Sequence, residues 1–419
     1  MSGLSYLEKL LDGAEVEWRT LDSVGQFLRG KRFVKSDLIS EGVPCIHYGE
    51  MYTHYGISAE ETKSFLDEGV AEKLRVANHG DVIIVAAGET IEDIGNGTAW
   101  LGKNDVVFHD ACFSFKSELN SKYVSYFLRT NLFKEQIKRG VSSGKISSIN
   151  AKGLGMAEIP IPCPNNPEKS LAIQSEIVRI LDKFTALTAE LTAELTMRKK
   201  QYNYYRDLLL SFEEGEVEWK TLEEVLVDKF WIMPATPKFD DNGEIPYVTS
   251  KNISGGNIDF ERVKHISRDD FLSISKNRPI LKGDFLISMI GTIGEIARVK
   301  CLDPDFYGQN MYLIRLNEEL LHPRYFLHFF DSPRMKFYFK SVKNNSGQGY
   351  LKANNIDGLS IPLPSIDEQQ KIAFILDKFD TLTNSITEGL PREIELRQKQ
   401  YEYYRDLLFS FPKPETVSN

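Results

Sequence analysis

The sequence is poor in cysteine and has no long hydrophobic run. Its four cysteines are far apart and form no C-x-x-C pair, which argues against a disulfide framework and against a cysteine zinc site. No apolar segment approaches the ~20 residues that a membrane-spanning helix requires. The opening residues, MSGLSYLEKL, have neither the basic nor the apolar part of a secretory signal. We therefore expect a protein of the reducing cytoplasm.

An excess of positive charge is missing as well, and so are the usual catalytic motifs. The chain carries 51 Lys and Arg against 60 Asp and Glu, a formal net charge of −9, which argues against indiscriminate binding of polyanions but allows a local nucleic-acid surface. There is no complete G-x-G-x-x-G, no G-x-x-x-x-G-K-[ST] and no Asn/Asp-Pro-Pro-aromatic loop. Cys45, His47 and His54 lack the fourth ligand of a zinc site. We expect no catalytic residue and no metal site in this chain.

What the sequence does contain is an internal repeat. Four motifs return in the same order: EVEWRTL (15–21) as EVEWKTL (216–222), IPIP (159–162) as IPLP (361–364), ILDKF (180–184) as ILDKF (375–379), and RKKQYNYYRDLLLSF (198–212) as RQKQYEYYRDLLFSF (397–411). The 419 residues, 42% of them hydrophobic, are therefore two copies of one ~200-residue segment, each long enough to bury a core.

The two copies agree in their frame and differ in their interior. Between the EVEW motif and the IPxP motif almost every residue differs, whereas the part after IPxP is nearly the same. This contrast favours one scaffold that presents two different recognition surfaces. Drift after a recent duplication is the alternative, although drift would not spare one half of each copy. The frame predicts four segments: a first domain at 1–165, a first helical spacer at 166–212, a second domain at 213–365, and a second helical spacer with a C-terminal tail at 366–419.

Each spacer has the hydrophobic spacing of a long helix. From Ile173 to Phe212 apolar residues recur every three or four positions, which predicts a coiled-coil-like stripe that needs a partner helix. The equivalent stripe from about Asp367 to Phe411 is the obvious partner, and two helices related by a pseudo-two-fold axis would pack antiparallel.

The interiors of the two copies read as mixed α and β structure. Residues 81–85 and 284–288 are predicted as short buried strands after a glycine, and 123–138 and 323–340 have helical spacing. The expected fold class is α+β: two similar mixed α/β domains separated by two long helices packed as an antiparallel coiled coil, with an internal pseudo-two-fold repeat.

Neither domain is basic overall, but each ends in a basic stretch before its IPxP motif. Residues 129–152 contain six basic residues and one acidic residue, and residues 324–352 again contain six and one. Both stretches include a polar Ser-Gly turn, so each could follow phosphates and bring side chains to base edges. A solvated helix face with an ordinary turn is the alternative. The candidate DNA-binding residues are Lys134, Lys138, Arg139, Ser143, Lys145, Lys152, Arg334, Lys336, Lys340, Lys343, Ser346, Gln348 and Lys352.

These features together resemble a known family. Two variable domains that alternate with two nearly identical helical segments are similar to the specificity subunit of a type I restriction–modification enzyme. LDKFTALTAELTAEL (181–195) followed by MRKKQYNYYRDLLLSF (197–212) resembles its subtype IC. The resemblance covers essentially the whole chain and is most specific in the helical segments.

The resemblance implies a division of labour within a larger complex. Each variable domain would be a target recognition domain that reads one half of a bipartite, asymmetric sequence in double-stranded DNA. The helices would set the spacing and dock two methyltransferase subunits that carry S-adenosylmethionine. Restriction and translocase subunits, with ATP and magnesium, would complete the complex, and this chain would bind no cofactor. The partner-binding residues implied in the repeated helical motif are Tyr202, Tyr205, Arg206, Tyr401, Tyr404 and Arg405.

The second helical segment departs from the repeat in one place. Between Phe184 and Arg198 lie 13 residues, whereas between Phe379 and Arg397 lie 17, including Gly389-Leu390-Pro391. Because proline lacks a backbone N–H and clashes with the preceding turn, we expect the second helix to be kinked or broken there. The rival to the specificity-subunit hypothesis is a coiled-coil scaffold that assembles protein partners without reading DNA.

Overall fold

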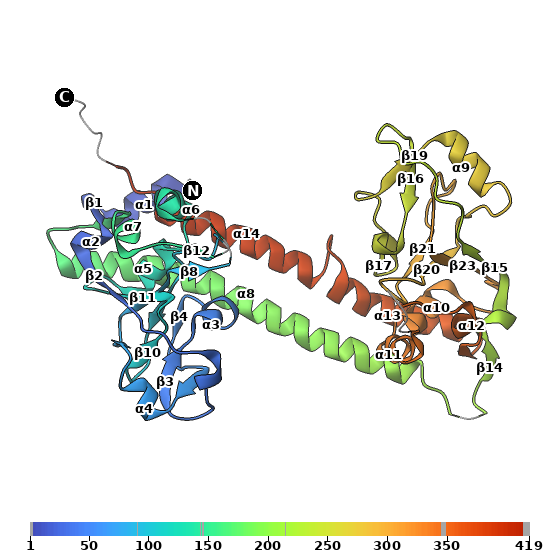
Figure 1. The fold of residues 1–419 in the computed structure, drawn as a ribbon, viewed down its shortest axis with the longest axis horizontal. Coiled ribbons are helices and arrows are strands. Elements are labelled where there is room, and N and C mark those ends of the chain that lie inside the picture. The colour runs from blue at the N-terminus through green and yellow to red at the C-terminus, as the bar shows by residue number, and fades with distance from the viewer. Residues whose placement is uncertain are drawn as a thin grey trace. The chain divides into compact units, whose positions relative to one another are not determined.

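The computed structural model describes residues 3–89, 91–142, 144, 146–213, 215–344 and 349–413. The chain forms two compact units (Figure 1): unit 1 comprises residues 1–190 with 394–419, and unit 2 comprises residues 191–393. Each unit therefore combines one variable domain with the start of the helical spacer of its own copy and the end of the spacer of the other copy. Among the described residues, no helix is both long and apolar enough to cross a membrane.

Unit 1 is built on a five-stranded sheet and a four-stranded sheet. The first has the order β2-β11-β7-β9-β4 and the second β5-β3-β10-β6; the pairs β4–β9 and β3–β10 are parallel and the others antiparallel. The strands are β1 Val16–Thr20, β2 Gly25–Arg29, β3 Val43–Ile46, β4 Ser58–Ala59, β5 Ser64–Leu66, β6 Val76–Ala77, β7 Val82–Val85, β8 Ala87–Gly88, β9 Gly97–Trp100, β10 Val106–Phe108, β11 Cys112–Ser117, β12 Ser147–Ser148 and β13 Glu158–Pro162. The helices are α1 Gly3–Leu11, α2 Leu21–Val24, η1 Lys35–Asp37, α3 Tyr48–Thr53, α4 Glu68–Ala71, α5 Ser121–Phe127, α6 Asn131–Ile137, η2 Lys138–Gly140, α7 Ala151–Gly155 and the first part of α8 Pro167–Leu209.

Unit 2 repeats this plan with different strands. A four-stranded sheet has the order β15-β23-β20-β21, and a three-stranded sheet has the order β19-β16-β22, in which β16 and β22 are parallel. The strands are β14 Glu218–Thr221, β15 Leu226–Ile232, β16 Ile245–Val248, β17 Ile253–Ser254, β18 Asn257–Ile258, β19 Lys264–Ile266, β20 Phe285–Ser288, β21 Ile296–Arg298, β22 Tyr307–Gly308, β23 Met311–Leu316 and β24 Ser360–Leu363. The helices are η3 Leu222–Val225, η4 Ser250–Asn252, α9 Arg268–Ser275, α10 Pro323–Phe330, α11 Pro333–Val342, α12 Ala353–Asp357, α13 Ile366–Asn384 and α14 Leu390–Leu408, the last of which continues into unit 1.

The motifs that frame each copy are strands that pair with each other. In unit 1, β1 pairs antiparallel with β13 and sets Trp18 opposite Pro160. In unit 2, β14 pairs with β24 and sets Trp219 opposite Pro362. A two-stranded ribbon tolerates proline because one edge has no partner strand. The EVEW and IPxP motifs therefore close each domain at the point where it joins its helix.

The predicted buried strands are confirmed, whereas each predicted helix before the Ser-Gly turn is two helices. All four residues of β7 and of β20 are buried. Residues 123–138 divide into α5 and α6, where Thr130 caps α6 by accepting the N–H of Phe133, and residues 323–340 divide into α10 and α11, where Ser332 accepts the N–H of Met335. Each hydroxyl caps the start of a new helix, and the hydrophobic spacing of the sequence does not show this boundary.

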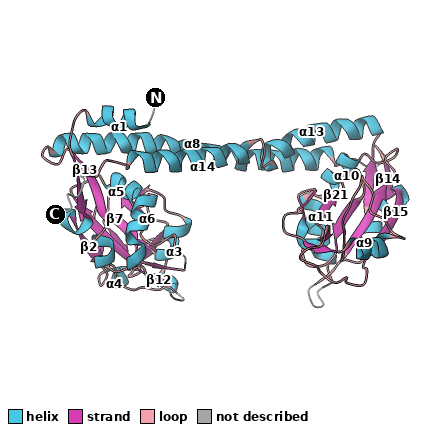
Figure 2. Cartoon of the chain, turned by 90° about the horizontal axis from the view of Figure 1, so that it is seen from above, coloured by secondary structure: helices cyan, strands magenta, loops and turns pink. Residues whose placement is uncertain are grey.

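The long helices pack within each unit. In unit 1, α14 runs antiparallel to the first part of α8 (Figure 2), and Phe184 stacks on Tyr404 with ring centroids 5.2 Å apart. In unit 2, Tyr205 of α8 stacks on Phe379 of α13 with ring centroids 5.4 Å apart. The expected antiparallel pairing of the two spacers is thus present as the same aromatic contact in both units.

The predicted break in the second helix is confirmed. Helix α13 ends at Asn384 and α14 begins at Leu390, one residue before Pro391. Gly389 has φ +83°, and a Cβ there would lie 2.4 Å from the carbonyl oxygen of Thr381. Glycine is required because an L-residue would meet both a strained φ and a backbone clash.

Candidate nucleic-acid interface

The two predicted basic stretches occupy equivalent helices. The first runs through α6, η2 and α7 in unit 1, and the second runs through α11 and α12 in unit 2. The exposed cations among the candidates are Lys138, Arg139, Lys152, Arg334, Lys336, Lys340 and Lys352, and Lys343 is half-buried. Ser143, Lys145, Ser346 and Gln348 lie outside the described residues.

Lys134 differs from the other candidates because its amine is bonded inside unit 1. Its Nζ donates to the carbonyl oxygens of Glu92 and Ile94 at 3.0 and 2.8 Å and to Oδ1 of Asn96 at 2.8 Å. These bonds use all three donors of an ammonium group. Burial lowers the pKa of Lys134 to about 7. In this structure its donors hold the loop 92–96.

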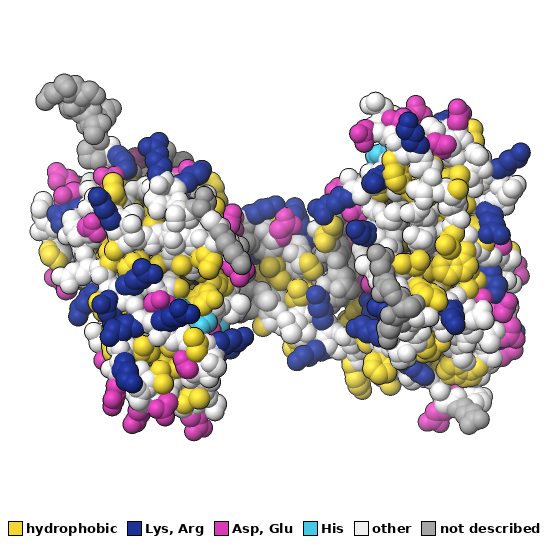
Figure 3. Space-filling view, in the orientation of Figure 1, with side chains coloured by type: hydrophobic (Ala, Val, Ile, Leu, Met, Phe, Trp, Pro, Cys, Tyr) yellow, Lys and Arg dark blue, Asp and Glu magenta, His cyan; other side chains and the backbone are white. Residues whose placement is uncertain are grey.

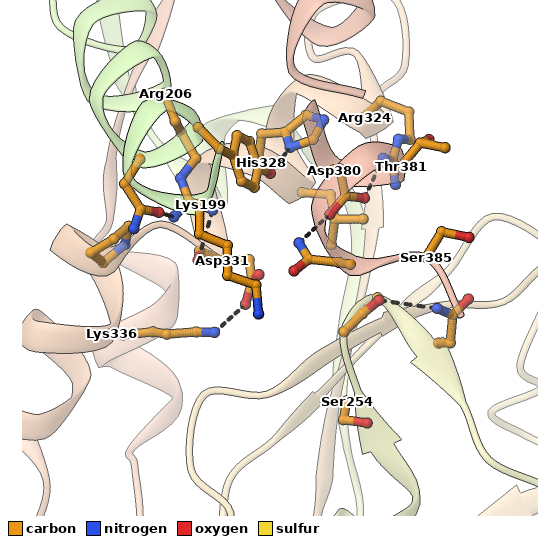
Figure 4. Close-up of a pocket in the computed structure, with 18 of the residues that line it drawn as sticks. Lys199, Arg206, Ser254, Arg324, His328, Asp331, Lys336, Asp380, Thr381 and Ser385 are labelled. Carbon is orange, nitrogen blue, oxygen red and sulfur yellow. Dashed lines mark hydrogen bonds and ion pairs between the residues drawn. The ribbon is translucent and has the colours of Figure 1, made fainter. Parts of the chain in front are cut away.

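A cationic groove lies beside the second basic stretch. The end of α8, helices α10 and α11, the turn at 254–257 and the end of α13 with residues 385–387 enclose about 1090 Å³. Figure 4 shows Lys199, Asp331 and Lys336 close together in this groove, with Lys336 Nζ 2.8 Å from Asp331 Oδ1. Lys340 also lines it. Among the described residues, Lys199 and Lys340 have no ion-pair partner, so both charges are available to a phosphate.

Unit 1 has a smaller groove in the equivalent place. It encloses about 570 Å³ and is lined by Arg129 and Lys138 of the domain and by Tyr401 and Arg405 of α14. In unit 2 the matching residues of α8, Tyr202 and Arg206, line the larger groove. In both copies the groove is therefore formed by a variable domain and the repeated tyrosine–arginine motif.

A carboxylate anchors each domain to the spacer of its own copy. Asp182 of α8 accepts hydrogen bonds from Lys122 Nζ at 2.5 Å and from Tyr126 Oη at 2.7 Å. In unit 2 the equivalent Asp377 of α13 faces Arg324 Nε at 2.8 Å and His328 Nε2 at 2.7 Å. The frame keeps the aspartate while its partners differ between the copies.

The environment of Asp377 strongly favours its charged form. Burial raises the pKa of this carboxyl, but the hydrogen bonds from His328 and Arg324 outweigh it and bring the pKa to about 2. Because an ionised carboxylate only accepts, the His328 Nε2 carries the proton, and Nδ1 then accepts from Tyr202 Oη at 2.9 Å. His328 is buried and links α10, α8 and α13.

The six residues implied in partner binding fall into two groups. Tyr202, Arg206, Tyr401 and Arg405 are buried, with each arginine over the ring of its tyrosine at 4.6 and 5.6 Å. Tyr205 and Tyr404 are about 40% exposed.

Sequence reasoning missed the tyrosines that are most exposed. Tyr204 and Tyr403 are 63% and 62% exposed, and they meet Tyr205 and Tyr404 edge to face at 5.4 and 5.3 Å. The two units thus present the same pair of exposed tyrosine rings.

Further cations lie outside the predicted stretches. Figure 3 shows Lys and Arg side chains gathered across the middle of the visible face of unit 1, with acidic side chains along one edge. The segment RGKRFVK, residues 29–35, begins at the last residue of β2 and carries four exposed cations, Arg29, Lys31, Arg32 and Lys35. In unit 2 a pocket of about 510 Å³ is lined by Lys251, Arg262 and Lys264, with Lys264 Nζ 4.3 Å above the ring of Phe239.

Comparison with known proteins decides the family. A family model for the type I restriction modification DNA specificity domain matches residues 14–197 and again residues 215–396, one match in each copy. The chain belongs to the type I restriction–modification specificity family.

Relatives within this specificity family span the full chain. The chain is 41% identical over 440 residues to the specificity subunit of the type I restriction enzyme EcoR124I/EcoR124II of Escherichia coli, covering 100% of both. It is 35% identical over 403 residues to the specificity subunit of the type I restriction enzyme EcoprrI of the same organism, covering 93% of each.

Solved structures share the specificity-family fold. The S subunit of the type I restriction–modification system from M. genitalium superposes with a TM-score of 0.52 at 16% identity, covering 96% of this chain and 98% of that one. A chain from a study of complex assembly and conformational transition in a type I system gives 0.58 at 16% identity, covering 94% and 97%. The predicted resemblance and fold class are confirmed, and the specificity-subunit hypothesis is favoured over a scaffold that does not read DNA.

The cations of residues 29–35 could have been found in the sequence of this specificity-family chain. Four of the seven residues 29–35 are basic, a density higher than in either predicted stretch. The run is not repeated, because unit 2 has no such cluster of basic residues after β15. Its cations at 251, 262 and 264 come together only through the fold.

Proposed function

We propose that this chain is the DNA-reading, non-catalytic subunit of a type I restriction–modification complex. Each unit reads one half of a bipartite, asymmetric sequence in double-stranded DNA. The observation that carries this proposal is the contrast between frame and interior: the same anchoring aspartate, groove and tyrosine pair recur in both units, whereas the exposed side chains of the two domains differ. Two different half-sites require different base-reading side chains on one scaffold.

The exposed cations of α6–η2 and α11 would follow the phosphate backbone. Lys138 and Arg139 at the end of α6 and Lys340 and Lys343 at the end of α11 hold equivalent places in the two units. Contacts to phosphate position a protein on the duplex without choosing a sequence. A local concentration of such charges accounts for DNA binding by a chain whose net charge is −9.

The repeated tyrosine pairs would dock two copies of one partner. Tyr204 with Tyr205 and Tyr403 with Tyr404 present the same edge-to-face geometry, and exposed tyrosine is typical of protein interfaces. Two equivalent surfaces on one chain favour two identical subunits, and the family relationship points to methyltransferase subunits that carry S-adenosylmethionine. Restriction and translocase subunits would bring ATP and magnesium, so this chain needs no cofactor of its own.

The salt dependence of DNA binding tests the phosphate contacts. We expect Lys138→Ala with Arg139→Ala, and separately Lys340→Ala with Lys343→Ala, to weaken binding by the methyltransferase complex on every sequence. Each lost phosphate contact lowers the slope of log affinity against log salt by about 0.9. The measurement is fluorescence anisotropy of labelled duplex DNA at several salt concentrations.

Lys220→Ala is the matched control, because Lys220 lies in β14, outside both basic stretches. It should leave the slope unchanged. If both double variants keep the wild-type slope, these helices do not contact the DNA phosphates. A wild-type complex that binds no DNA would refute the proposed function.

A further inference from the structure

The two units have one more equivalent place, where two parallel strands end side by side. In unit 1, β3 and β10 are parallel and end at Ile46 and Phe108. In unit 2, β16 and β22 are parallel and end at Val248 and Gly308. The carboxyl ends of parallel strands meet at the same edge of a sheet. The residues that follow these strands therefore come together in both units.

One backbone hydrogen bond closes this edge in the same way in both copies. The N–H of His109 donates to the carbonyl oxygen of Ile46 at 3.2 Å, and the N–H of Gln309 donates to that of Val248 at 3.1 Å. His109 and Gln309 are thus structural equivalents, although their side chains differ.

In unit 1 this edge carries a cluster of four rings. The ring centroid of His47 lies 5.0 Å from that of His109 and 4.6 Å from that of Tyr48, and Phe33 lies 5.2 Å from His109. Phe33 and His109 are buried, while His47 and Tyr48 are half-buried. The buried pair supports the two rings that reach the surface.

His47 presents one hydrogen-bond donor to the outside. Its Nδ1 accepts the N–H of Gly49 at 3.2 Å, so the ring proton of the neutral form is on Nε2. Burial lowers the pKa of His47, with Lys35 adding to the effect against the opposing charge of Glu50. Among the described residues, Nε2 has no hydrogen-bond partner, which leaves a fixed donor at the surface.

In unit 2 the same edge carries two side-chain amides, those of Gln309 and Asn310. Gln309 Oε1 accepts from Thr236 Oγ1 at 3.1 Å and from Tyr247 Oη at 3.4 Å. The next residue, Asn310, has φ +62° and lines the 510 Å³ pocket. Its side-chain amide has no hydrogen-bond partner among the described residues. A non-glycine residue held at positive φ is strained, and such strain gathers at functional positions.

Cations surround both edges. In unit 1 the cations near the ring cluster are Arg29, Lys31, Arg32 and Lys35. The charge of Lys35 helps to lower the pKa of His47, and that of Arg32 helps to lower the pKa of His109. Lys251, Arg262 and Lys264 line the pocket that contains Asn310. An uncharged hydrogen-bonding group inside a rim of cations is the arrangement that reads a base edge while the rim holds phosphates.

We propose that His47 and Asn310 are the base-reading residues of the two half-sites, a conclusion that rests on the proposed function. His47 Nε2 donates to an acceptor in the major groove, such as N7 or O6 of guanine. Asn310 offers a donor and an acceptor together, which pairs with N6 and N7 of adenine. The two half-sites differ because the same sheet edge presents an imidazole donor after β3 in one copy and a carboxamide after β22 in the other.

The test is the methylated motif of single-residue variants. Each variant is co-expressed with a type I methyltransferase subunit in an unmethylated host, and modified adenines are mapped by sequencing the genomic DNA. We expect His47→Ala to relax one position of one half-site and Asn310→Gly to relax one position of the other, each by roughly 10-fold in base preference. Asn310→Asp should move its position from adenine towards cytosine, because an aspartate accepts from cytosine N4.

The variants are chosen so that folding does not decide the result. Glycine accepts the positive φ of Asn310 without strain, and His54→Ala and Asn277→Ala remove exposed side chains of the same types elsewhere in the same units. Both controls should keep the wild-type motif. A wild-type motif in His47→Ala and in Asn310→Gly, or a change in the gap between half-sites, would overturn the assignment. Absence of a bipartite motif with the wild-type chain would instead overturn the proposed function.

Discussion

At the scale of single residues, the anchoring aspartates show what the duplication preserved. Asp182 and Asp377 hold the same place in the repeat, and each binds two side chains one turn apart on α5 and on α10. The partner of the aspartate is Tyr126 in one copy and His328 in the other. The contact was kept through divergence because it fixes each domain on its helix.

Removing this carboxylate in unit 2 should lower stability in a pH-dependent way. The pKa of Asp377 falls from the ordinary 3.8 to about 2, so its contribution is complete above pH 4 and is lost as the pH falls from about 4 through about 2. We expect Asp377→Asn to cost about 1 kcal/mol near pH 7, since the carboxylate is partly exposed and screened. That corresponds to about 2–4 °C in Tm.

Thermal melts of the full chain between pH 2 and 7 check this expectation. The Tm difference between wild type and Asp377→Asn should shrink below pH 4, while Asp303→Asn, which removes an exposed carboxylate, should show no difference at any pH. A constant Tm difference over the whole range would show that the charge of Asp377 does not stabilise unit 2.

Residue counting predicted where cations gather but not what they contact. Lys134 belongs to the basic stretch by position, yet its amine bonds Glu92, Ile94 and Asn96. The sequence pattern does not show that the loop 92–96 folds against Lys134. In the sequence His47 stands only in an incomplete set of metal ligands with Cys45 and His54, and its ring neighbour His109 lies 62 residues further along the chain.

At the scale of elements, the sequence predicted the helices better than their interruptions. The apolar stripe from Ile173 to Phe212 predicts α8, which begins six residues before Ile173 and ends three residues before Phe212. Gly389 with Pro391 predicts the break between α13 and α14. The break can be predicted from glycine and proline because these residues act on the backbone itself, whatever their tertiary contacts. The break at Thr130 and Ser332 depends on a side-chain cap, which hydrophobic spacing does not show.

Deleting one of the two TAEL repeats tests the role of α8 as a spacer. Residues 188–191 and 192–195 are identical tetrads inside one uninterrupted helix, and four residues span about 6 Å. Since base pairs stack about 3.4 Å apart, we expect the unread gap to shorten by one or two base pairs with both half-sites unchanged. Methylation mapping of the deletion variant gives the answer, and an altered half-site with the original gap would refute the spacer role.

At the scale of the whole molecule, duplication explains why each unit contains helices from both copies. Unit 1 ends with residues of the second spacer, and unit 2 contains the end of the first. Tyr401 and Phe409 enter the core of unit 1, and Tyr202 and Leu210 enter that of unit 2. The helical motif at 198–212 and 397–411 is nearly identical in both copies because each must complete a domain of the other copy.

The repeat, the fold class and the family could be inferred from the sequence, because motif order and helical spacing are linear properties. The reading surface could not, because it forms where β3 meets β10 and where β16 meets β22. In these places residues far apart in the chain become neighbours, and the two copies no longer align by sequence.

The methylation map of the wild-type complex tests the central claim most directly. The chain is co-expressed with a type I methyltransferase subunit in an unmethylated host, and modified adenines are located across the genome. The account predicts one split motif, with two short and different half-sites around a gap of fixed length. A stable co-purifying complex that leaves the genome unmethylated, or one that methylates a single continuous motif, would contradict it.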